Sequence, residues 1–359
     1  MRKLNFSSGP AVLPEEVLRR AQEAIWDLDG SGIGILEHSH RGVEFGRVLD
    51  GAEAAVRELG GIGDEFAVLF VTAGATHHFA LVPENFLAAE QTADYCHTGV
   101  WSQKAMDEAR RLGTVHVACS SEADNFASVP ATCTYSTAPR YVHYTSNETI
   151  YGTQWPEPPG GAPAPLVCDA SSDIFSKPLV LAGHGLVYAG AQKNLGPAGI
   201  SLVIARKSFV DTANADLPPL SRYATYVRER SMHNTPNTFG IWMIGETCRW
   251  ILAQGGLVAM AERNARKAAV LYDFLDHSKK WRPHAAPGSR SMMNVTFHSR
   301  ASYGREAEAY EDELLTTAKA RGMSGLRGHR SVGGMRASIY NAFPESGVHQ
   351  LVALLYELD

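Results

Sequence analysis

Short apolar runs alternate with amphipathic helical windows along most of this 359-residue chain, and this alternation restricts the possible folds more than any other feature. Repeated strand and helix is typical of an α/β protein in which helices cover a mostly parallel sheet. The expected strands are residues 66–71, 93–97, 141–145, 165–169, 186–190 and 200–205. Two helices, at residues 14–28 and 43–59, are expected before the first of them. The sequence therefore predicts an α/β fold for the first two thirds of the chain.

The pattern changes near Thr235, where two long helical windows follow each other. The expected elements from here on are helices 239–254 and 258–278, strand 293–298, helix 304–321, strand 335–340 and helix 346–358. A long helix followed by this alternation is typical of a second, smaller α/β domain. We predict a large domain at residues 15–255 and a small C-terminal domain at 256–359, with residues 1–14 packing near the functional site.

The charge balance and the cysteines narrow the class of ligand. The chain has 33 basic and 38 acidic residues, so no positive field indicates binding to nucleic acid or to an anionic membrane. Its five cysteines are scattered without a C-x-x-C pair, which favours reduced thiols over a disulfide frame or a zinc site. The sequence contains neither a basic and apolar leader nor an apolar run of about 18 residues. We expect a cytoplasmic protein with small-molecule partners and no metal.

Lys193 lies in an unusual position for a charged side chain. It lies between the apolar runs LVYAG and ISLVIA, among Gly, Ala, Gln and Asn, and both runs have the composition of doubly buried strands. A desolvated lysine lowers its pKa and can act as an amine nucleophile toward carbonyl compounds and pyridoxal 5'-phosphate (PLP). The structural alternative is a lysine that extends from a strand end into water.

Asp169 favours the chemical interpretation of Lys193. It ends the strand expected at residues 165–169, and ligands of open α/β sheets bind beyond the carboxyl ends of the strands. At two such ends, a carboxylate can pair with a pyridinium nitrogen while an amine holds the aldehyde of the same ring. Taken alone, Asp169 is also compatible with a helix N-cap. Together with Lys193, it predicts a PLP enzyme.

Other strand ends carry groups suited to the same cofactor. The turn at residues 72–78, TAGATHH, lies between a strand and a helix, so its backbone N–H groups and the Thr76 hydroxyl favour a phosphate. Trp101 and Thr149 each follow another expected strand, where an indole can stack on a ring and a hydroxyl can reach a ring oxygen. We exclude a metal site at His77–His78, because adjacent residues on a helix diverge and no carboxylate has suitable spacing.

Six segments resemble the phosphoserine aminotransferases, a class V, fold-type I family of PLP-dependent transaminases. They are NFSSGPAVLP, SHRGVEF, SNETIYG, YAGAQKNLGPAG, MHNTPNTF and GHRSVGGMRASIYNA. The resemblance runs from Asn5 to the C-terminal helix and is most specific in AGAQKN and in the GHRSVGGMRASIYNA segment. It implies a large PLP-binding domain, a small C-terminal domain, and a homodimer whose two active sites lie at the subunit interface.

The resemblance also implies a role for each candidate cofactor residue. It implies that Lys193 holds PLP as a Schiff base, that Asp169 pairs with the pyridine nitrogen and that Trp101 stacks on the ring. Further contacts implied in this way are Thr149 near the phenolic oxygen, Ala75, Thr76 and Gln192 at the phosphate, and Asn234 and Thr235 at that phosphate from the neighbouring subunit. The turn AGATHH departs from the glycine-rich turn of many relatives, but a threonine hydroxyl and backbone amides can still bind phosphate.

A substrate with a carboxylate and a phosphate needs two separated cationic anchors, and arginine suits both oxyanions. By resemblance, Arg336 clamps the α-carboxylate. The residues implied to surround the phosphate or the side-chain carboxylate of glutamate are His40, Arg41, His329 and Arg330, with Ser8 near the substrate. The implied reaction converts 3-phosphohydroxypyruvate and glutamate reversibly into phosphoserine and 2-oxoglutarate. Use of a four-carbon phosphohydroxy keto acid of pyridoxine biosynthesis stays open.

Two other functions are compatible with parts of the sequence. An alanine–glyoxylate type of class V aminotransferase would share the lysine and the aspartate, but has less use for two His-Arg pairs. A nicotinamide-dependent oxidoreductase is indicated only by GSGIG at residues 30–34, which follows a helical window and not a strand. The phosphoserine reaction is therefore the preferred interpretation.

Overall fold

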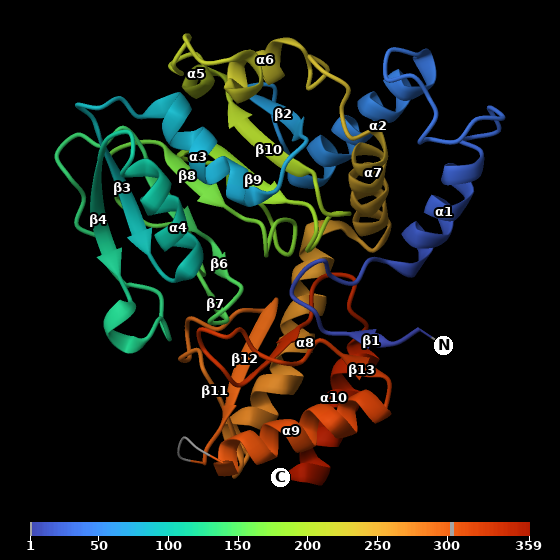
Figure 1. Ribbon diagram of the computed structural model, residues 1–359, viewed down its shortest axis with the longest axis vertical. Helices are drawn as coiled ribbons and strands as arrows, with labels where there is room; N and C mark the ends of the chain where they lie inside the picture. Colours follow the sequence, from blue (N-terminus) through green and yellow to red (C-terminus); the bar gives the residue numbers. More distant parts are fainter. Residues whose placement is uncertain (1, 302–304) are drawn as a thin grey trace.

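The computed structural model describes residues 2–301 and 305–359, and a seven-stranded sheet lies in its upper part as seen in Figure 1. The strands have the order β2-β10-β9-β8-β5-β3-β4. They are β2 (Phe66–Val71), β3 (Thr92–His97), β4 (Thr114–Ser120), β5 (Val142–Thr145), β8 (Leu166–Asp169), β9 (His184–Gly190) and β10 (Ser201–Arg206). Neighbouring strands are parallel except at β10, which is antiparallel to β2 and β9. The predicted α/β architecture with a mostly parallel sheet is confirmed.

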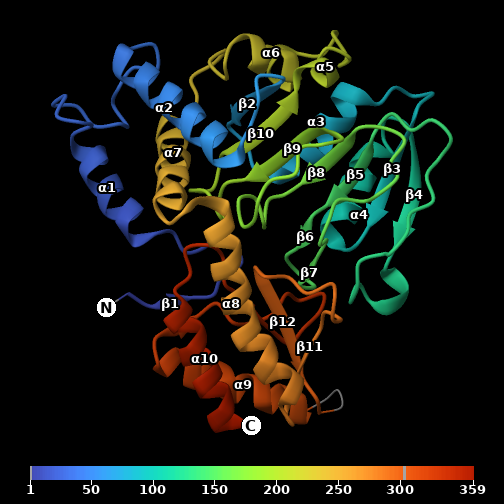
Figure 2. The ribbon, with the colours of Figure 1, turned by 180° about the vertical axis from the view of Figure 1, so that it is seen from behind.

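Helices cover both faces of this sheet (Figure 2). The helices α1 (Glu15–Trp26), α2 (Val43–Gly60) and α7 (Thr238–Ala253) contribute to the apolar core on one face. The helices α3 (Ala75–Phe86), α4 (Val100–Ala109) and α6 (Tyr223–Arg228) contribute to the core on the other. Strands β2, β5, β8 and β9 are buried along their whole length, because alternate side chains enter opposite cores. Packing on both faces thus holds the strand ends in place.

A second group of elements follows α7 and has its own core (Figure 1). The helix α8 (Gly256–His277) leads to an antiparallel sheet of β11 (Trp281–Pro283), β12 (Asn294–Ser299) and β14 (Met335–Ser338). The helices α9 (Arg305–Ala320) and α10 (Glu345–Leu358) pack on it. Strand β1 (Leu4–Asn5) pairs with β13 (Met323–Ser324), so the start of the chain lies against this C-terminal part.

The helices and strands predicted above are confirmed, with ends that differ by one or two residues. Gly304, the first residue of the predicted helix 304–321, lies outside the described residues. Strand β4 was not predicted, because it is an edge strand with a half-exposed sequence and lacks a continuous apolar run. The remaining short elements are β6 (Asn147–Glu148), β7 (Thr153–Gln154), α5 (Lys207–Val210) and the 3₁₀ turns at Glu122–Asp124 and Pro219–Ser221. Within residues 2–301 and 305–359, every helix is too short or too polar to cross a membrane.

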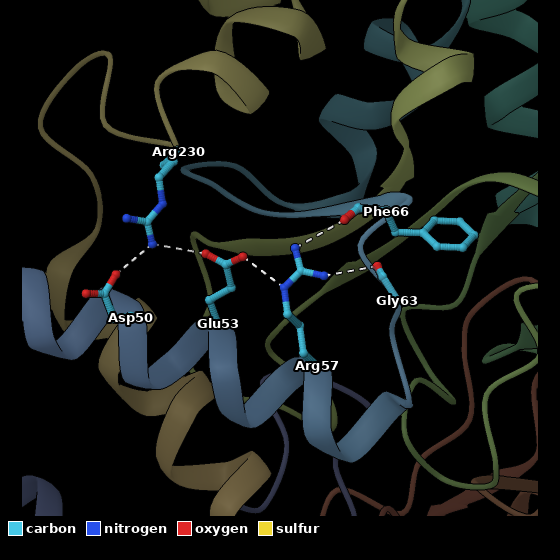
Figure 3. Close-up of polar contacts among 6 residues, drawn as sticks. All are labelled: Asp50, Glu53, Arg57, Gly63, Phe66 and Arg230. Carbon is cyan, nitrogen blue, oxygen red and sulfur yellow. Dashed lines mark hydrogen bonds and ion pairs between the residues drawn. The ribbon is translucent and has the colours of Figure 1, made fainter.

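A chain of ion pairs joins α2 to the segment before α7 (Figure 3). Arg230 contacts Asp50 at 2.6 Å and Glu53 at 3.1 Å, and Glu53 accepts a hydrogen bond from Arg57 at 2.9 Å. Arg57 also donates to the carbonyl groups of Gly63 and Phe66. The network therefore connects the start of β2, the helix α2 and the beginning of the segment at residues 230–237.

Candidate active site

The segments after the parallel strands enclose a cavity of about 310 Å³. Strands β2, β3, β5, β8 and β9 point in one direction, so their carboxyl ends meet at one edge of the sheet. The predicted site residues that line the cavity are Ser8, Ala75, Thr76, Trp101, Thr149, Asp169, Gln192, Lys193, His329 and Arg336. Residues from the N-terminal segment, the central sheet and the C-terminal part thus meet in a single site.

Lys193 follows β9 and is only 9% exposed. Its Nζ donates a hydrogen bond to Thr149 Oγ1 at 2.5 Å and lies 5.7 Å from the centre of the Trp101 ring. Burial lowers the pKa of Lys193 from 10.5 to about 8, while the negative charges of Asp169 and Glu148 oppose this shift. A substantial fraction of the amine is therefore neutral near physiological pH, as a nucleophile requires.

Asp169 ends β8, and the neighbouring Ser171 holds its carboxylate. The backbone N–H of Ser171 donates to Asp169 Oδ1 at 3.0 Å, and its hydroxyl donates to the same oxygen at 2.6 Å. The Ser171 hydroxyl also accepts from the N–H of Gly190 at the end of β9. Burial raises the pKa of Asp169, and the Ser171 hydrogen bonds and Lys193 counteract that rise. Both contacts of Ser171 use Oδ1, which leaves Oδ2 to pair with a ligand. The sequence analysis did not identify Ser171, although this residue lies in the polar run DASSD at the end of a predicted strand.

An anion cradle lies at the N-terminus of α3. The N-cap, Gly74, offers no side chain to the first N–H groups of the helix, and Ala75 and Thr76 line the cavity. A Cβ added to Gly190 would lie 2.7 Å from Gln192 Oε1 and 3.3 Å from the nitrogen of Ala75, so glycine allows this close approach. Among the described residues, the buried Gln192 Oε1 has no hydrogen-bond partner. A flip of the Gln192 side-chain amide, which exchanges its oxygen and nitrogen, would instead present N–H donors to a phosphate.

A cationic group lies across the cavity on β14. Arg336 is 8% exposed, and its guanidinium donates to Ser8 Oγ at 2.7 Å and to the carbonyl of Thr149 at 3.4 Å. Its buried Nε has no hydrogen-bond partner within the described part of the chain. Burial lowers the pKa of Arg336, but an arginine keeps its charge at any physiological pH. A buried guanidinium with an unused donor is suited to a carboxylate ligand.

Glu148 is a buried acid beside the site, and the sequence analysis did not identify it. Its carboxylate accepts weak hydrogen bonds from the backbone N–H of Trp101 at 3.3 Å and of Ile150 at 3.4 Å. Burial raises the pKa of Glu148 to about 8. The acid touches the backbone at Trp101, so it helps to orient the start of α4.

The other five predicted site residues do not line the cavity of this chain. Of these, Arg41, Asn234, Thr235 and Arg330 are exposed, and His40 is half-buried. The segment that carries Asn234 and Thr235 is nevertheless tied to the sheet at both ends. Ser231 Oγ accepts from the N–H of Phe70, and the N–H of Asn237 donates to Thr72 Oγ1.

His78 belongs to the core under the cradle and is absent from the cavity lining. Its ring contacts the Tyr223 hydroxyl at 2.8 Å and Ser201 Oγ at 2.6 Å, and burial lowers its pKa to about 3. His77 is exposed. The two rings thus diverge, as expected for neighbours on a helix.

The fold and the buried lysine define a class of enzyme, and the comparison with protein families identifies it. The family described as aminotransferase class V matches residues 3–351. The chain therefore belongs to the class V aminotransferase family.

Individual relatives are similar over the full length. The phosphoserine aminotransferase of Herpetosiphon aurantiacus is 47% identical over 358 residues, 99% of this chain and 98% of that protein. The solved phosphoserine aminotransferase from Bacillus circulans subsp. alkalophilus has a TM-score of 0.95 at 44% identity and covers 99% of this chain and 98% of its own. A PLP-bound phosphoserine aminotransferase from Trichomonas vaginalis has a TM-score of 0.94 at 35% identity, with 99% and 100% covered.

Proposed function

We propose that this chain is a PLP-dependent transaminase that interconverts 3-phosphohydroxypyruvate plus L-glutamate and O-phospho-L-serine plus 2-oxoglutarate. The observation that carries the proposal is the buried Lys193, with its lowered pKa, in one cavity with Asp169, Trp101 and an anion cradle. The names of the relatives support the choice of substrate.

The residues present fit PLP at each of its functional groups. The cradle of Ala75, Thr76 and Gln192 suits the phosphate, and Asp169 Oδ2 suits a protonated ring nitrogen. Trp101 provides an aromatic face, and the Thr149 hydroxyl lies next to the amine. When bound, PLP would supply an aldehyde carbon and an electron-withdrawing ring for the transfer of an amino group.

The protein's own groups divide the chemical work. Lys193 Nζ would take the proton from the α-carbon of glutamate, and its lowered pKa leaves part of the amine unprotonated and able to act as a base. Asp169 would pair with the ring nitrogen, and the two hydrogen bonds from Ser171 favour the charged form of its carboxylate against the effect of burial. Arg336 holds the α-carboxylate of either amino acid and so fixes the α-carbon relative to Lys193.

We further propose a homodimer in which a second copy completes each site. Asn234 and Thr235 would reach the phosphate of PLP, and His40 and Arg41 would act with His329 and Arg330 on the substrate's distal anion. The exposure of Asn234, Thr235 and Arg41, and of apolar side chains near His40, supports this assembly. The exposed apolar side chains near His40 are Ile25, Trp26, Ile33, Leu36 and Val43.

We also propose a domain boundary between α7 and α8, with a large domain at residues 15–255 and a small domain at 256–359. Gly255 and Gly256 both have positive φ, 99° and 74°, so the chain turns sharply between the two helices. Two largely separate apolar cores support the division, although Leu257 and Met260 at the start of α8 pack in the core of the preceding part.

Such an enzyme of amino-acid metabolism would work in the cytoplasm.

Reduction with borohydride tests the cofactor assignment. After treatment of the PLP-loaded enzyme, peptide mapping should find a pyridoxyl group on Lys193. A Lys193→Ala variant should carry no such group and should be inactive. A pyridoxyl group on another lysine would contradict the assignment.

The substrate is tested by activity with 2-oxoglutarate and phosphoserine, serine or alanine as amino donor. Phosphoserine should be strongly preferred, because serine lacks the distal phosphate that the His-Arg pairs are proposed to bind. Arg330→Ala should raise the KM for phosphoserine about tenfold or more. Equal activity with alanine would instead favour a small-substrate aminotransferase of the same family.

A further inference from the structure

Three of the five cysteines, which the sequence predicted to be scattered, lie together in the fold. Their sulfurs, on Cys96, Cys119 and Cys133, all lie within 4.8 Å of one another, and the Sγ atoms of Cys96 and Cys133 are 3.9 Å apart. None of the three lines the cavity around Lys193. The spacing along the chain could not reveal this cluster, because two strands and a loop contribute one cysteine each.

A local irregularity of the sheet aligns the first two cysteines. Strands β3 and β4 run parallel, and their register shifts between Tyr95 and Cys96. Tyr95 lies opposite Val117, and Cys96 therefore lies opposite Cys119 instead of Ala118. Since successive strand residues face opposite sides, this shift brings the two thiols to the same side of the sheet.

A backbone contact brings in the third cysteine. The N–H of Thr134 donates to the carbonyl of Ala118 at 2.8 Å, and the His116 ring contacts the carbonyl of Thr134. These contacts hold the loop after β4 beside the strand, with Cys133 next to Cys119. Cys96 is buried, while Cys119 and Cys133 are half-buried, so an ion can enter from the solvent side.

The distances fit metal coordination better than a disulfide. Zn–S bonds of about 2.3 Å in a tetrahedral site separate the sulfurs by about 3.8 Å, close to the observed 3.9 Å between Cys96 and Cys133. The widest pair needs to close by no more than about 1 Å. A disulfide requires about 2.05 Å between the sulfurs. Thiolates also prefer soft metals such as zinc over the hard cations that carboxylates bind.

We propose that Cys96, Cys119 and Cys133 form a binding site for a thiophilic divalent ion of the Zn²⁺ class. Each thiol releases its proton to solvent as its sulfur binds the metal, and water or a small anion fills the fourth position. The ion would join β3, β4 and the loop around Cys133 at one edge of the sheet. Strand β3 leads directly into α4, which carries Trp101, so the ion would also stiffen the support of that ring.

Metal content of the reduced, PLP-loaded enzyme tests the proposal. After equilibration with Zn²⁺ and removal of free ion, the wild type should retain one Zn²⁺ per chain, measured by atomic emission. Cys133→Ser should retain none, because the cluster keeps only two sulfurs. The matched control is Cys248→Ser, which changes a buried cysteine of α7 outside the cluster and should retain the ion. Equal retention by wild type and Cys133→Ser would overturn the proposal.

Cobalt distinguishes coordination by sulfur from binding elsewhere. Co²⁺ added to the reduced enzyme should produce a sulfur-to-cobalt charge-transfer band in the near ultraviolet. Addition of Zn²⁺ should displace the Co²⁺ and abolish the band. The band should be absent in Cys133→Ser. Position 133 is half-buried in a loop, and an unchanged circular dichroism spectrum of the variant would exclude misfolding. The proposal would be overturned if the reduced wild type showed no such band. It would also be overturned if the wild type bound no cobalt and formed only a Cys96–Cys133 disulfide in air. Neither readout depends on transaminase activity.

Discussion

Burial by itself does not distinguish Lys193, the proposed catalytic lysine, from a structural one. Lys267 is also fully buried, and its pKa is lowered well below the ordinary value. Its Nζ, however, donates to the carbonyl groups of Ile339 at 2.9 Å and Tyr340 at 2.7 Å. Within the described part of the chain, the Lys193 amine donates a hydrogen bond to the Thr149 hydroxyl alone, and it faces a cavity. The difference lies in what surrounds the amine: Lys267 is satisfied by backbone oxygens, whereas Lys193 is available for chemistry.

The cost of burying Lys193 predicts how stability depends on pH. The folded pKa of about 8 lies below the unfolded value of 10.5. Burial of the charged amine therefore lowers the free energy of unfolding by its full amount below pH 8, and this loss of stability disappears as the pH rises toward 10.5. Lys193→Met should therefore stabilise the cofactor-free protein at pH 7 by roughly 3 kcal/mol, and by much less at pH 10. Urea unfolding of both proteins at the two pH values measures this.

An exposed lysine over the same ring provides the control for this measurement. Lys104 lies on α4 with its Nζ 4.9 Å from the centre of the Trp101 ring, but it is exposed to solvent. Lys104→Met should change the stability by less than about 0.5 kcal/mol at either pH. A gain from Lys193→Met that is equally large at pH 7 and pH 10 would exclude charge burial as its cause.

At the scale of elements, the site depends on strand direction. Strands β2, β5, β8 and β9 are parallel and deliver their carboxyl ends to one edge, while β10 runs the opposite way between β2 and β9. The antiparallel β10 returns the chain after Lys193 without a crossover helix, and the first part of the connecting loop, which carries the lysine, is buried. The loop between β9 and β10 thus positions Lys193 next to the ends of β5 and β8.

The ion pairs of Arg230 provide a test at this scale. Arg230 is more than half exposed, so Arg230→Ala should reduce the free energy of unfolding by less than about 1 kcal/mol. It should nevertheless weaken PLP binding several-fold, because Arg230 secures the start of the segment that carries Asn234 and Thr235. Titration of the cofactor-free enzyme with PLP, followed by absorbance, measures the Kd.

A neighbouring arginine is the matched control. Arg228 pairs only with the adjacent Glu229 among the described residues, and both side chains are exposed. Arg228→Ala should leave the Kd for PLP unchanged. If both variants bind PLP with the same affinity as the wild type, the segment at residues 230–237 has no part in the cofactor site.

At the scale of the whole molecule, a shared site makes a distinct prediction for mixed dimers. Lys193→Ala and Arg41→Ala homodimers should both be inactive or nearly so. When the two variants exchange subunits, one of the two sites in each mixed dimer contains neither substitution if Arg41 serves its partner's site. Random exchange should then restore roughly a quarter of the wild-type activity. No recovery after verified exchange would indicate that Arg41 and Lys193 act within the same chain.

Local patterns were sufficient to predict most elements of the fold, because apolar periodicity and strand ends are properties of neighbouring residues. They also singled out Lys193 and Asp169, since a lysine and an aspartate beside buried strands are unusual by composition alone. Edge strand β4 escaped prediction because its half-exposed sequence carries no such pattern. The roles of Ala75, Gln192 and Arg336 came from resemblance to a family and not from their local sequence.

Tertiary structure alone decided which groups meet. The hydrogen bonds from Ser171 to Asp169, the contact between Arg336 and Ser8, and the carbonyl groups around Lys267 depend on how the elements pack. The cluster of Cys96, Cys119 and Cys133 likewise depends on a register shift between two strands. The sequence by itself determined the α/β elements and the reactive amine. Packing determined its neighbours, because contacts between distant residues arise only when the apolar faces of helices and strands are buried together.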